Sequence, residues 1–199
     1  GLGDDTFNKV GVGDIVVGGT GTDTVNFDLS SATEDLTINL LTSEGAGGSW
    51  TGVEFANGNL GSGNDSVTAG MQLGHIYGNG GSDSITLDYS GTLADGRTAS
   101  QISFGRNYDS NGRNQTVTLD DGTVITSAVN GFEHLNIIGT DGDDVIDGSA
   151  GSSGNGEAGN QLFGGAGNDV LTGGAGADVL DGGLGDDTFN KVGVGDIVV

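Results

Sequence analysis

Residues Gly164–Asn190 read GGAGNDVLT, GGAGADVLD and GGLGDDTFN, three nonapeptides that follow one another without a gap. Each has glycine at positions 1, 2 and 4, aspartate at position 6 and an apolar residue at position 8. A further unbroken copy occupies Gly18–Asn26, and looser copies occupy residues 60–68, 78–86 and 139–147. A fixed short period is typical of repeat architectures, so this pattern governs the fold. The position-6 aspartates are Asp23, Asp65, Asp83, Asp144, Asp169, Asp178 and Asp187.

The nonapeptide combines a turn with a short strand. Glycine allows the positive φ angles of a tight turn, and an apolar residue between two outward-facing neighbours forms a minimal strand. Two nonapeptides then make one flattened coil, so residues 18 apart in sequence become neighbours at a strand spacing of about 4.8 Å. No window sustains a helical period. The sequence therefore predicts an all-β fold, a parallel β-roll or β-solenoid.

Two segments, residues 27–59 and 87–138, lack nonapeptides but contain alternating apolar residues. Residues 115–119 and 123–126 flank an Asp-Asp-Gly turn and predict a β-hairpin. Both segments end, before the next nonapeptide, in similar short sequences, Val53-Glu54-Phe55 and Gly131-Phe132-Glu133-His134-Leu135. We expect enlarged coils of one continuous solenoid, divided into residues 1–26 (nonapeptides), 27–59 (enlarged coil), 60–86 (degenerate nonapeptides), 87–138 (enlarged coil with hairpin) and 139–199 (nonapeptides).

A larger duplication is also present. Residues 183–199 and 1–17 are the same 17 residues, GLGDDTFNKVGVGDIVV. Asp5 is therefore the equivalent of Asp187, and residues 1–26 begin another copy of the unit that ends at residue 182. We expect a 182-residue tandem unit of a longer protein, with adjacent copies stacked end to end as partners.

Composition excludes several classes of function. The 199 residues include 43 glycines, no cysteine, five Lys+Arg and 28 Asp+Glu, for a net charge of −23. Disulfides and thiolate metal sites are impossible, and so few basic residues predict no nucleic-acid partner. No apolar run approaches the ~20 residues of a membrane span, which predicts no membrane insertion. The H-E-x-x-H, G-x-S-x-G and P-loop motifs are absent. We therefore expect no enzymatic activity.

The stacked aspartates predict a divalent cation. Side chains such as Asp169 and Asp187 lie 18 residues apart and would repel one another on adjacent coils. An ion between two turns would take carboxylate oxygens and backbone carbonyls from both. Such a set of hard oxygen ligands suits Ca²⁺, whereas Mg²⁺ requires shorter octahedral contacts and Zn²⁺ prefers His or Cys.

The G-G-x-G-x-D-x-U-x pattern, where U is apolar, resembles the repeats of the RTX (repeats-in-toxin) family. This resemblance implies a right-handed β-roll in which the position-6 aspartate bridges adjacent Ca²⁺ ions and carbonyls of positions 1–4 complete each shell. Asp14 and Asp196 depart from this pattern, because Lys9-Val10 and Lys191-Val192 replace the glycine pair. The lysine could take the place of an ion there. The implied calcium-binding residues are Gly1, Gly3, Asp5, Gly18, Gly19, Thr20, Gly21, Asp23, Asp65, Asp83, Asp144, Gly164, Gly165, Ala166, Gly167, Asp169, Gly173, Gly174, Ala175, Gly176, Asp178, Gly182, Gly183, Leu184, Gly185 and Asp187.

The functional expectation is a calcium-dependent structural repeat of a large secreted or cell-surface protein, such as an adhesin stalk, sheath or filament. The resemblance further implies export by a type I secretion system. One alternative is a module that binds extracellular polysaccharide through Trp50, Tyr108 and the loop containing Arg97, Arg106 and Arg113. Another is the secretion tail of an enzyme outside this sequence.

Overall fold

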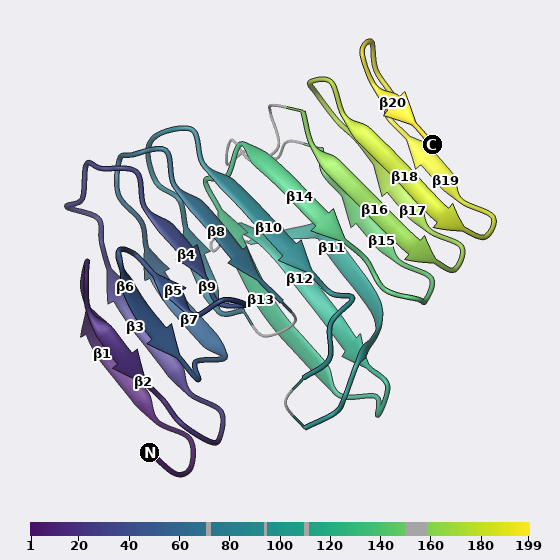
Figure 1. The fold of residues 1–199 in the computed structure, drawn as a ribbon. Helices are drawn as coiled ribbons and strands as arrows, with labels where there is room; N and C mark the ends of the chain where they lie inside the picture. Colours follow the sequence, from purple (N-terminus) through teal and green to yellow (C-terminus); the bar gives the residue numbers. More distant parts are fainter. Residues whose placement is uncertain (71–72, 94, 110–111, 150–158) are drawn as a thin grey trace.

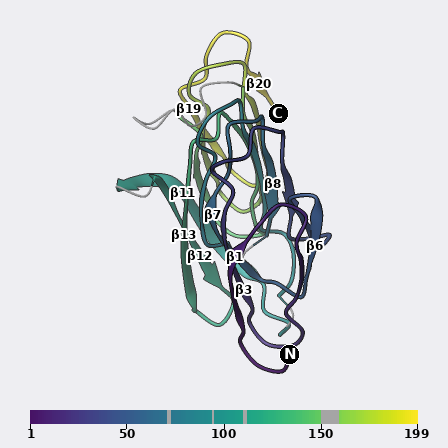
Figure 2. The ribbon, with the colours of Figure 1, turned by 90° about the vertical axis from the view of Figure 1, so that its left-hand side faces the viewer.

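A computed structural model describes residues 1–70, 73–93, 95–109, 112–149 and 159–199, with the side chains of residues 106–109 and 112–113 outside the described part. Within these ranges the regular secondary structure consists of strands. The chain passes alternately between two sheets that lie face to face (Figures 1 and 2). The fold is therefore all-β and β-roll-like. No helix in the described ranges is long and apolar enough to cross a membrane.

The first sheet contains ten strands among the described residues. In spatial order they are β1 (Thr6–Val10), β3 (Thr24–Asp28), β7 (Phe55–Asn59), β9 (His75–Tyr77), β13 (Val124–Asn130), β12 (Gly112–Leu119), β11 (Ala99–Asp109), β15 (Val145–Asp147), β17 (Val170–Thr172) and β19 (Thr188–Asn190).

The second sheet also contains ten strands in the described part of the chain. Their spatial order is β2 (Ile15–Val17), β6 (Gly48–Thr51), β5 (Glu44–Gly45), β4 (Thr37–Asn39), β8 (Ser66–Ala69), β10 (Ser84–Asp88), β14 (His134–Ile138), β16 (Gln161–Ala166), β18 (Val179–Leu184) and β20 (Ile197–Val198).

Every second nonapeptide pairs in parallel, at the spacing that the repeat predicts. Leu162 lies opposite Leu180 and Leu171 lies opposite Phe189, 18 residues apart in each case. β16 and β18 extend through Ala166 and Leu184, because the stacked glycine segments also pair, with Gly165 opposite Gly183. These segments, expected as turns, are therefore partly strand.

The enlarged coils add antiparallel strands, so both sheets are mixed rather than wholly parallel. β4, β5 and β6 form one antiparallel insert, and β11, β12 and β13 form another. The hairpin predicted around Asp-Asp-Gly is the β12–β13 pair, with Leu119 N donating to Thr123 O at 2.8 Å. Antiparallel strands can return through a short turn within one sheet, whereas parallel strands need a crossover. The inserts thus lengthen a coil without interrupting the stack, and β11–β13 extend beyond it in Figure 2.

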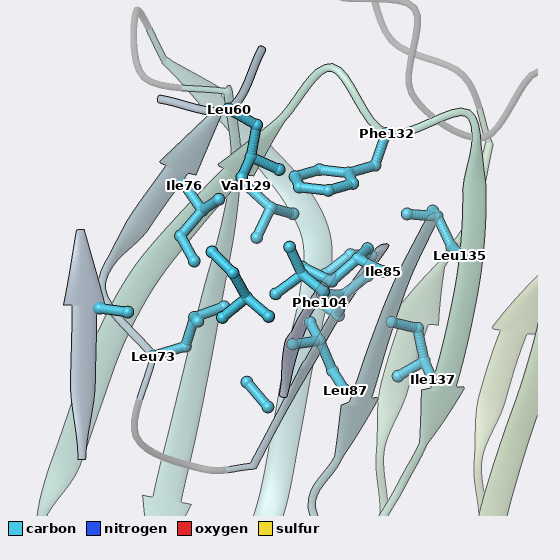
Figure 3. Packing of buried hydrophobic residues seen from close by; sticks show 14 of the residues in the cluster. Leu60, Leu73, Ile76, Ile85, Leu87, Phe104, Val129, Phe132, Leu135 and Ile137 are labelled. Atoms are coloured by element: carbon cyan, nitrogen blue, oxygen red, sulfur yellow. The ribbon is translucent and has the colours of Figure 1, made fainter. Parts of the chain in front are cut away.

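A continuous apolar core lies between the two sheets. The position-8 residues Leu162, Leu171 and Leu180 are fully buried in its narrow part. Larger side chains, among them Phe104 and Phe132, fill the core where the enlarged coils widen it (Figure 3). Inward-facing residues thus alternate with outward-facing polar ones, as the two faces of a strand require.

Candidate calcium site

The position-6 aspartates form two columns, one along each sheet. In each column the backbone N–H of one residue donates to the carboxylate of the equivalent residue on the next coil. Asp144 N donates to Asp169 Oδ1 at 2.8 Å, and Asp169 N donates to Asp187 Oδ1 at 2.9 Å. The other members have the same bond: Asp5 to Asp23 (2.8 Å), Asp65 to Asp83 (2.8 Å), Asn160 to Asp178 (2.7 Å) and Asp178 to Asp196 (2.9 Å). The coils therefore bring together carboxylates that lie far apart in sequence.

The glycines of each turn make room for the aspartate and for the next turn. At position 1, a Cβ atom on Gly164 would lie 2.2 Å from Asp169 Oδ2. At position 4, Gly185 has φ of 131° and its Cβ would lie 1.8 Å from Gly167 O. Only glycine combines this φ with so close an approach of two backbones. The predicted glycine positions therefore line the turn against which the carboxylate packs.

The second carboxylate oxygen divides the aspartates into two groups. In the first group, which comprises Asp23, Asp83, Asp169 and Asp178, Oδ2 is buried and has no hydrogen-bond partner among the described residues. All four residues are at most 1% exposed. A buried acceptor without a partner is destabilising, and an unpaired buried charge more so. These oxygens thus require a group that the described residues do not supply.

In the second group the turn itself satisfies the oxygen. Asp144 Oδ2 accepts from Thr140 N at 2.7 Å, and Asp65 Oδ2 accepts from Gly61 N at 3.2 Å. Asp14 and Asp196 likewise accept from Gly11 N and Gly193 N. The ion pairs of the described residues include neither Lys9 nor Lys191, so a backbone amide rather than lysine faces these two carboxylates. The chain therefore uses one aspartate position in two ways.

Burial has the expected electrostatic effect on Asp83, Asp169 and Asp178. Desolvation raises the pKa of Asp83 and of Asp169 to about 6, and raises that of Asp178 as well. The neighbouring carboxylates Asp65 and Asp187 add to the increase at Asp83 and Asp169, respectively. A cation close to Oδ2 would favour the charged form and remove this penalty.

The donor set fits a hard divalent ion. No group of three or more His, Cys, Asp or Glu side chains converges in the described ranges, so backbone carbonyls must complete any site. Gly182 O lies 2.7 Å from the Cβ position of Gly164, which Asp169 Oδ2 also faces. Carboxylate and carbonyl oxygens together are the ligands of Ca²⁺.

The remaining predicted site residues lie in the same turns. Asp5 and Asp187 are half-buried and directly precede β1 and β19, respectively. Asp187 Oδ2 packs against Gly182. The backbone positions predicted as ligands are Gly1, Gly3, Gly18, Gly19, Thr20, Gly21, Gly164, Gly165, Ala166, Gly167, Gly173, Gly174, Ala175, Gly176, Gly182, Gly183, Leu184 and Gly185.

Two column members were missed by the sequence analysis. Asp23 N donates to Glu54 Oε2 and Asp83 N donates to Glu133 Oε2, both at 2.8 Å. Glu54-Phe55-Ala56 and Glu133-His134-Leu135 match positions 6–8 of the nonapeptide, Asp-x-apolar, except that glutamate replaces aspartate. This match is the sequence signal for both residues. Neither glutamate follows a glycine pair, so the nonapeptide pattern does not mark it.

Of the residues considered for glycan binding, the structure describes the side chains of Trp50 and Arg97. Trp50 is 1% exposed and packs on Phe27, with ring centroids 5.6 Å apart, so it cannot stack on a sugar. Arg97 pairs with Asp95 at 2.7 Å and with Asp121 at 3.3 Å. The side chains of Tyr108, Arg106 and Arg113 lie outside the described part of the structure.

Stacked glycine turns with buried carboxylates define a β-roll-like protein that binds calcium through its repeats. In agreement, the family model of the RTX calcium-binding nonapeptide repeat matches residues 136–152 and 155–189, in four copies. These residues are RTX repeats, and such repeats bind Ca²⁺. No curated protein matched the chain.

Proposed function

We propose that this chain is a calcium-dependent structural repeat of a large secreted or cell-surface protein, such as an adhesin stalk, sheath or filament, with no catalytic role. The observation that carries the proposal is the set of unpartnered Oδ2 atoms on Asp23, Asp83, Asp169 and Asp178. These carboxylates occupy one motif position in several coils of the stack, which is an arrangement of ion ligands in a scaffold rather than of a single reactive centre.

Folding of this chain depends on its charge. The net charge of −23 opposes compaction, and the ordered backbone adds a large entropic penalty. When bound, Ca²⁺ supplies positive charge between the coils. The position-6 carboxylates and the glycine carbonyls would hold it. Extracellular calcium modules have Kd values of about 10⁻⁴–10⁻³ M, so the repeats would be loaded outside the cell and empty at cytosolic calcium levels.

Stacking of tandem copies is supported by the duplicated coil. In residues 183–199 the carboxylate of Asp187 accepts from Asp169 N, while in residues 1–17 the N–H of the equivalent Asp5 donates to Asp23. A shared coil would therefore continue the column from one unit into the next. Copies joined in this way would form a semi-rigid rod, because each coil contacts its neighbours alone.

The proposal also includes a right-handed, continuous solenoid and export of the unfolded chain by a type I secretion system. The resemblance to RTX repeats implies both of these properties. An unfolded polyanion at low calcium suits passage through a secretion channel, and higher calcium outside would then drive folding.

Circular dichroism with and without 5–10 mM Ca²⁺ tests the proposal, at a concentration above the Kd expected for extracellular modules. We expect strand signal with calcium and its loss in EGTA. Replacement of Asp169, Asp178 and Asp187 by Ala should reproduce the effect of the chelator on the C-terminal coils. A chain with the same strand content in EGTA and in calcium would contradict the proposal.

A further inference from the structure

Two short turns stand where the repeats meet the enlarged coils. Residues 52–54 are Gly-Val-Glu and residues 131–133 are Gly-Phe-Glu, with the central apolar side chain buried in both. Their glycines are equivalent to position 1 of a nonapeptide: Gly18 N donates to Thr51 O and Gly78 N to Asn130 O, each just before that glycine. Gly139 N makes the same bond to Phe163 O, just before Gly164. Each turn thus replaces six residues, positions 1–6, by three.

Glutamate occupies the position-6 place in both short turns. Glu54 Oε2 accepts from Asp23 N and Glu133 Oε2 accepts from Asp83 N, at 2.8 Å in both cases. Asp169 Oδ1 accepts from Asp144 N at the same distance. The extra methylene of glutamate lets its carboxylate reach the column from a shorter turn. The same substitution accompanies the same shortening at two unrelated places in the chain.

The aspartate that faces each glutamate is buried and unpartnered. Asp23 and Asp83 are 0% exposed, and Oδ2 of each has no hydrogen-bond partner among the described residues. A Cβ on Gly18 would lie 2.5 Å from Asp23 Oδ2 and 2.0 Å from Gly52 O. A Cβ on Gly78 would lie 2.5 Å from Asp83 Oδ2 and 2.1 Å from Gly131 O. A carboxylate oxygen and a carbonyl oxygen from the following turn therefore meet at each place, as they do beside Gly164.

Burial alone does not explain why Oδ2 of Asp23 and of Asp83 lacks a hydrogen-bond partner. Asp65 and Asp144 are equally buried, yet their Oδ2 atoms accept backbone N–H groups of their own turns. Oδ2 of Asp23 and of Asp83 instead lies beside the position-1 glycine of its own turn, close to a carbonyl oxygen of the short turn that carries the glutamate. Beside the second of these turns, a polar hollow is lined by Tyr77, Asn79, Asn130 and Gly131.

We propose that Glu54 completes a calcium site with Asp23, and that Glu133 completes another with Asp83. The choice of ion rests on the proposed function, whereas the pairing of residues rests on the geometry above. Both sites lie outside the residues matched as RTX repeats. Each would fasten the end of an enlarged coil to the preceding nonapeptide, across 31 and 50 residues of chain. The calcium array would then extend over most of the stack.

The test counts calcium ions per folded chain by native mass spectrometry. Glu54→Gln and Glu133→Gln each remove a charge but keep an oxygen that can accept the Asp N–H bond, so the fold should persist in calcium. We expect each variant to lose one ion and the double variant two. Glu44→Gln, at an exposed position of β5, makes the same charge change away from the columns and should lose none.

A second measurement uses the wild-type chain, in case a variant does not fold. In calcium-loaded protein, carbodiimide labelling should modify exposed Glu44 and spare the half-buried Glu54 and Glu133. Unchanged ion counts in the variants, or ready labelling of both glutamates while the wild type holds calcium, would overturn this inference and leave the proposed function standing. A wild-type chain that binds no calcium would overturn both.

Discussion

The backbone N–H of Asp169 donates to Oδ1 of Asp187 on the next coil at 2.9 Å, while Oδ2 of Asp169 is buried without a partner. In Asp23, Asp83, Asp169 and Asp178, one carboxylate oxygen thus accepts a hydrogen bond from the neighbouring coil, and the other remains to bind an ion. This division means that the stack has its backbone connections in place but retains an uncompensated charge in each of several turns. Calcium should therefore affect stability through a few specific atoms.

Asp169→Asn should have opposite effects with and without calcium. With calcium, the loss of a charged ligand should lower the free energy of unfolding by about 1–3 kcal/mol, the usual effect of a buried polar group left without its partner. In EGTA at pH 7, where the wild type is expected to lose strand signal, removal of an unpaired buried charge should leave the variant with more of that signal. Urea denaturation in calcium and circular dichroism in EGTA measure this, with exposed Asp186→Asn as the control. A variant that is destabilised in calcium and also has less strand signal than the wild type in EGTA would contradict an ion-binding role.

Without calcium, stability should decrease as the pH rises. The pKa values of Asp83 and Asp169 are about 6 in the folded chain and about 3.8 in the unfolded one, so the folded state binds more protons between these values. The free energy of unfolding should therefore be highest below pH ~4, fall through pH 4–6 and level off above that range. With calcium the trend should reverse, because protons compete with the ion for the carboxylates. Urea denaturation in EGTA and in calcium at pH 4, 5, 6 and 7.5 tests both slopes. A rise in the stability of the calcium-free chain between pH 4 and 6 would contradict the prediction.

Gly164→Ala should destabilise the calcium-loaded chain. The added Cβ would lie 2.2 Å from Asp169 Oδ2 and 2.7 Å from Gly182 O, so the carboxylate or the next turn must move. We expect a loss of about 1–3 kcal/mol, as for other overpacked sites, together with weaker calcium binding. Gly91→Ala is the control, since its Cβ would meet no atom within 4 Å. Thermal unfolding in calcium compares the two, and equal melting temperatures would show that the carboxylate does not pack on this glycine.

Tyr89→Phe should destabilise the fold by a similar amount whether or not calcium is present. The hydroxyl of Tyr89 donates to Gln115 Oε1, and Gln115 Nε2 donates to Ser127 Oγ, with all three residues at most 3% exposed. Loss of the hydroxyl leaves a buried acceptor unsatisfied, which should lower the free energy of unfolding by about 1–3 kcal/mol. Urea denaturation at pH 4 in EGTA and at pH 7 in calcium should give the same difference from the wild type. The half-buried Tyr77→Phe is the control and should change stability by less than about 0.5 kcal/mol. A difference that appears in calcium alone would place this network at an ion site instead.

The sequence by itself determined the local geometry and the repeat. Glycine at positions 2 and 4 permits the positive φ angles of the turn, as in Gly165 and Gly167, and an apolar residue at position 8 favours burial, as in Leu171. The 18-residue stacking follows from these two, because each coil is two nonapeptides long. The columns at Asp169, Asp178 and Asp187 were predictable for the same reason.

Tertiary structure alone decided which carboxylates lack a partner and which glutamates join the columns. Asp144 and Asp169 share one motif position, but only the first turn directs an amide, Thr140 N, at Oδ2. Glu54 and Glu133 reach their aspartates after 31 and 50 residues whose path depends on antiparallel inserts. The physical reason is that register across a long insertion is set by the packing of the whole coil, whereas a turn is set by the few residues within it.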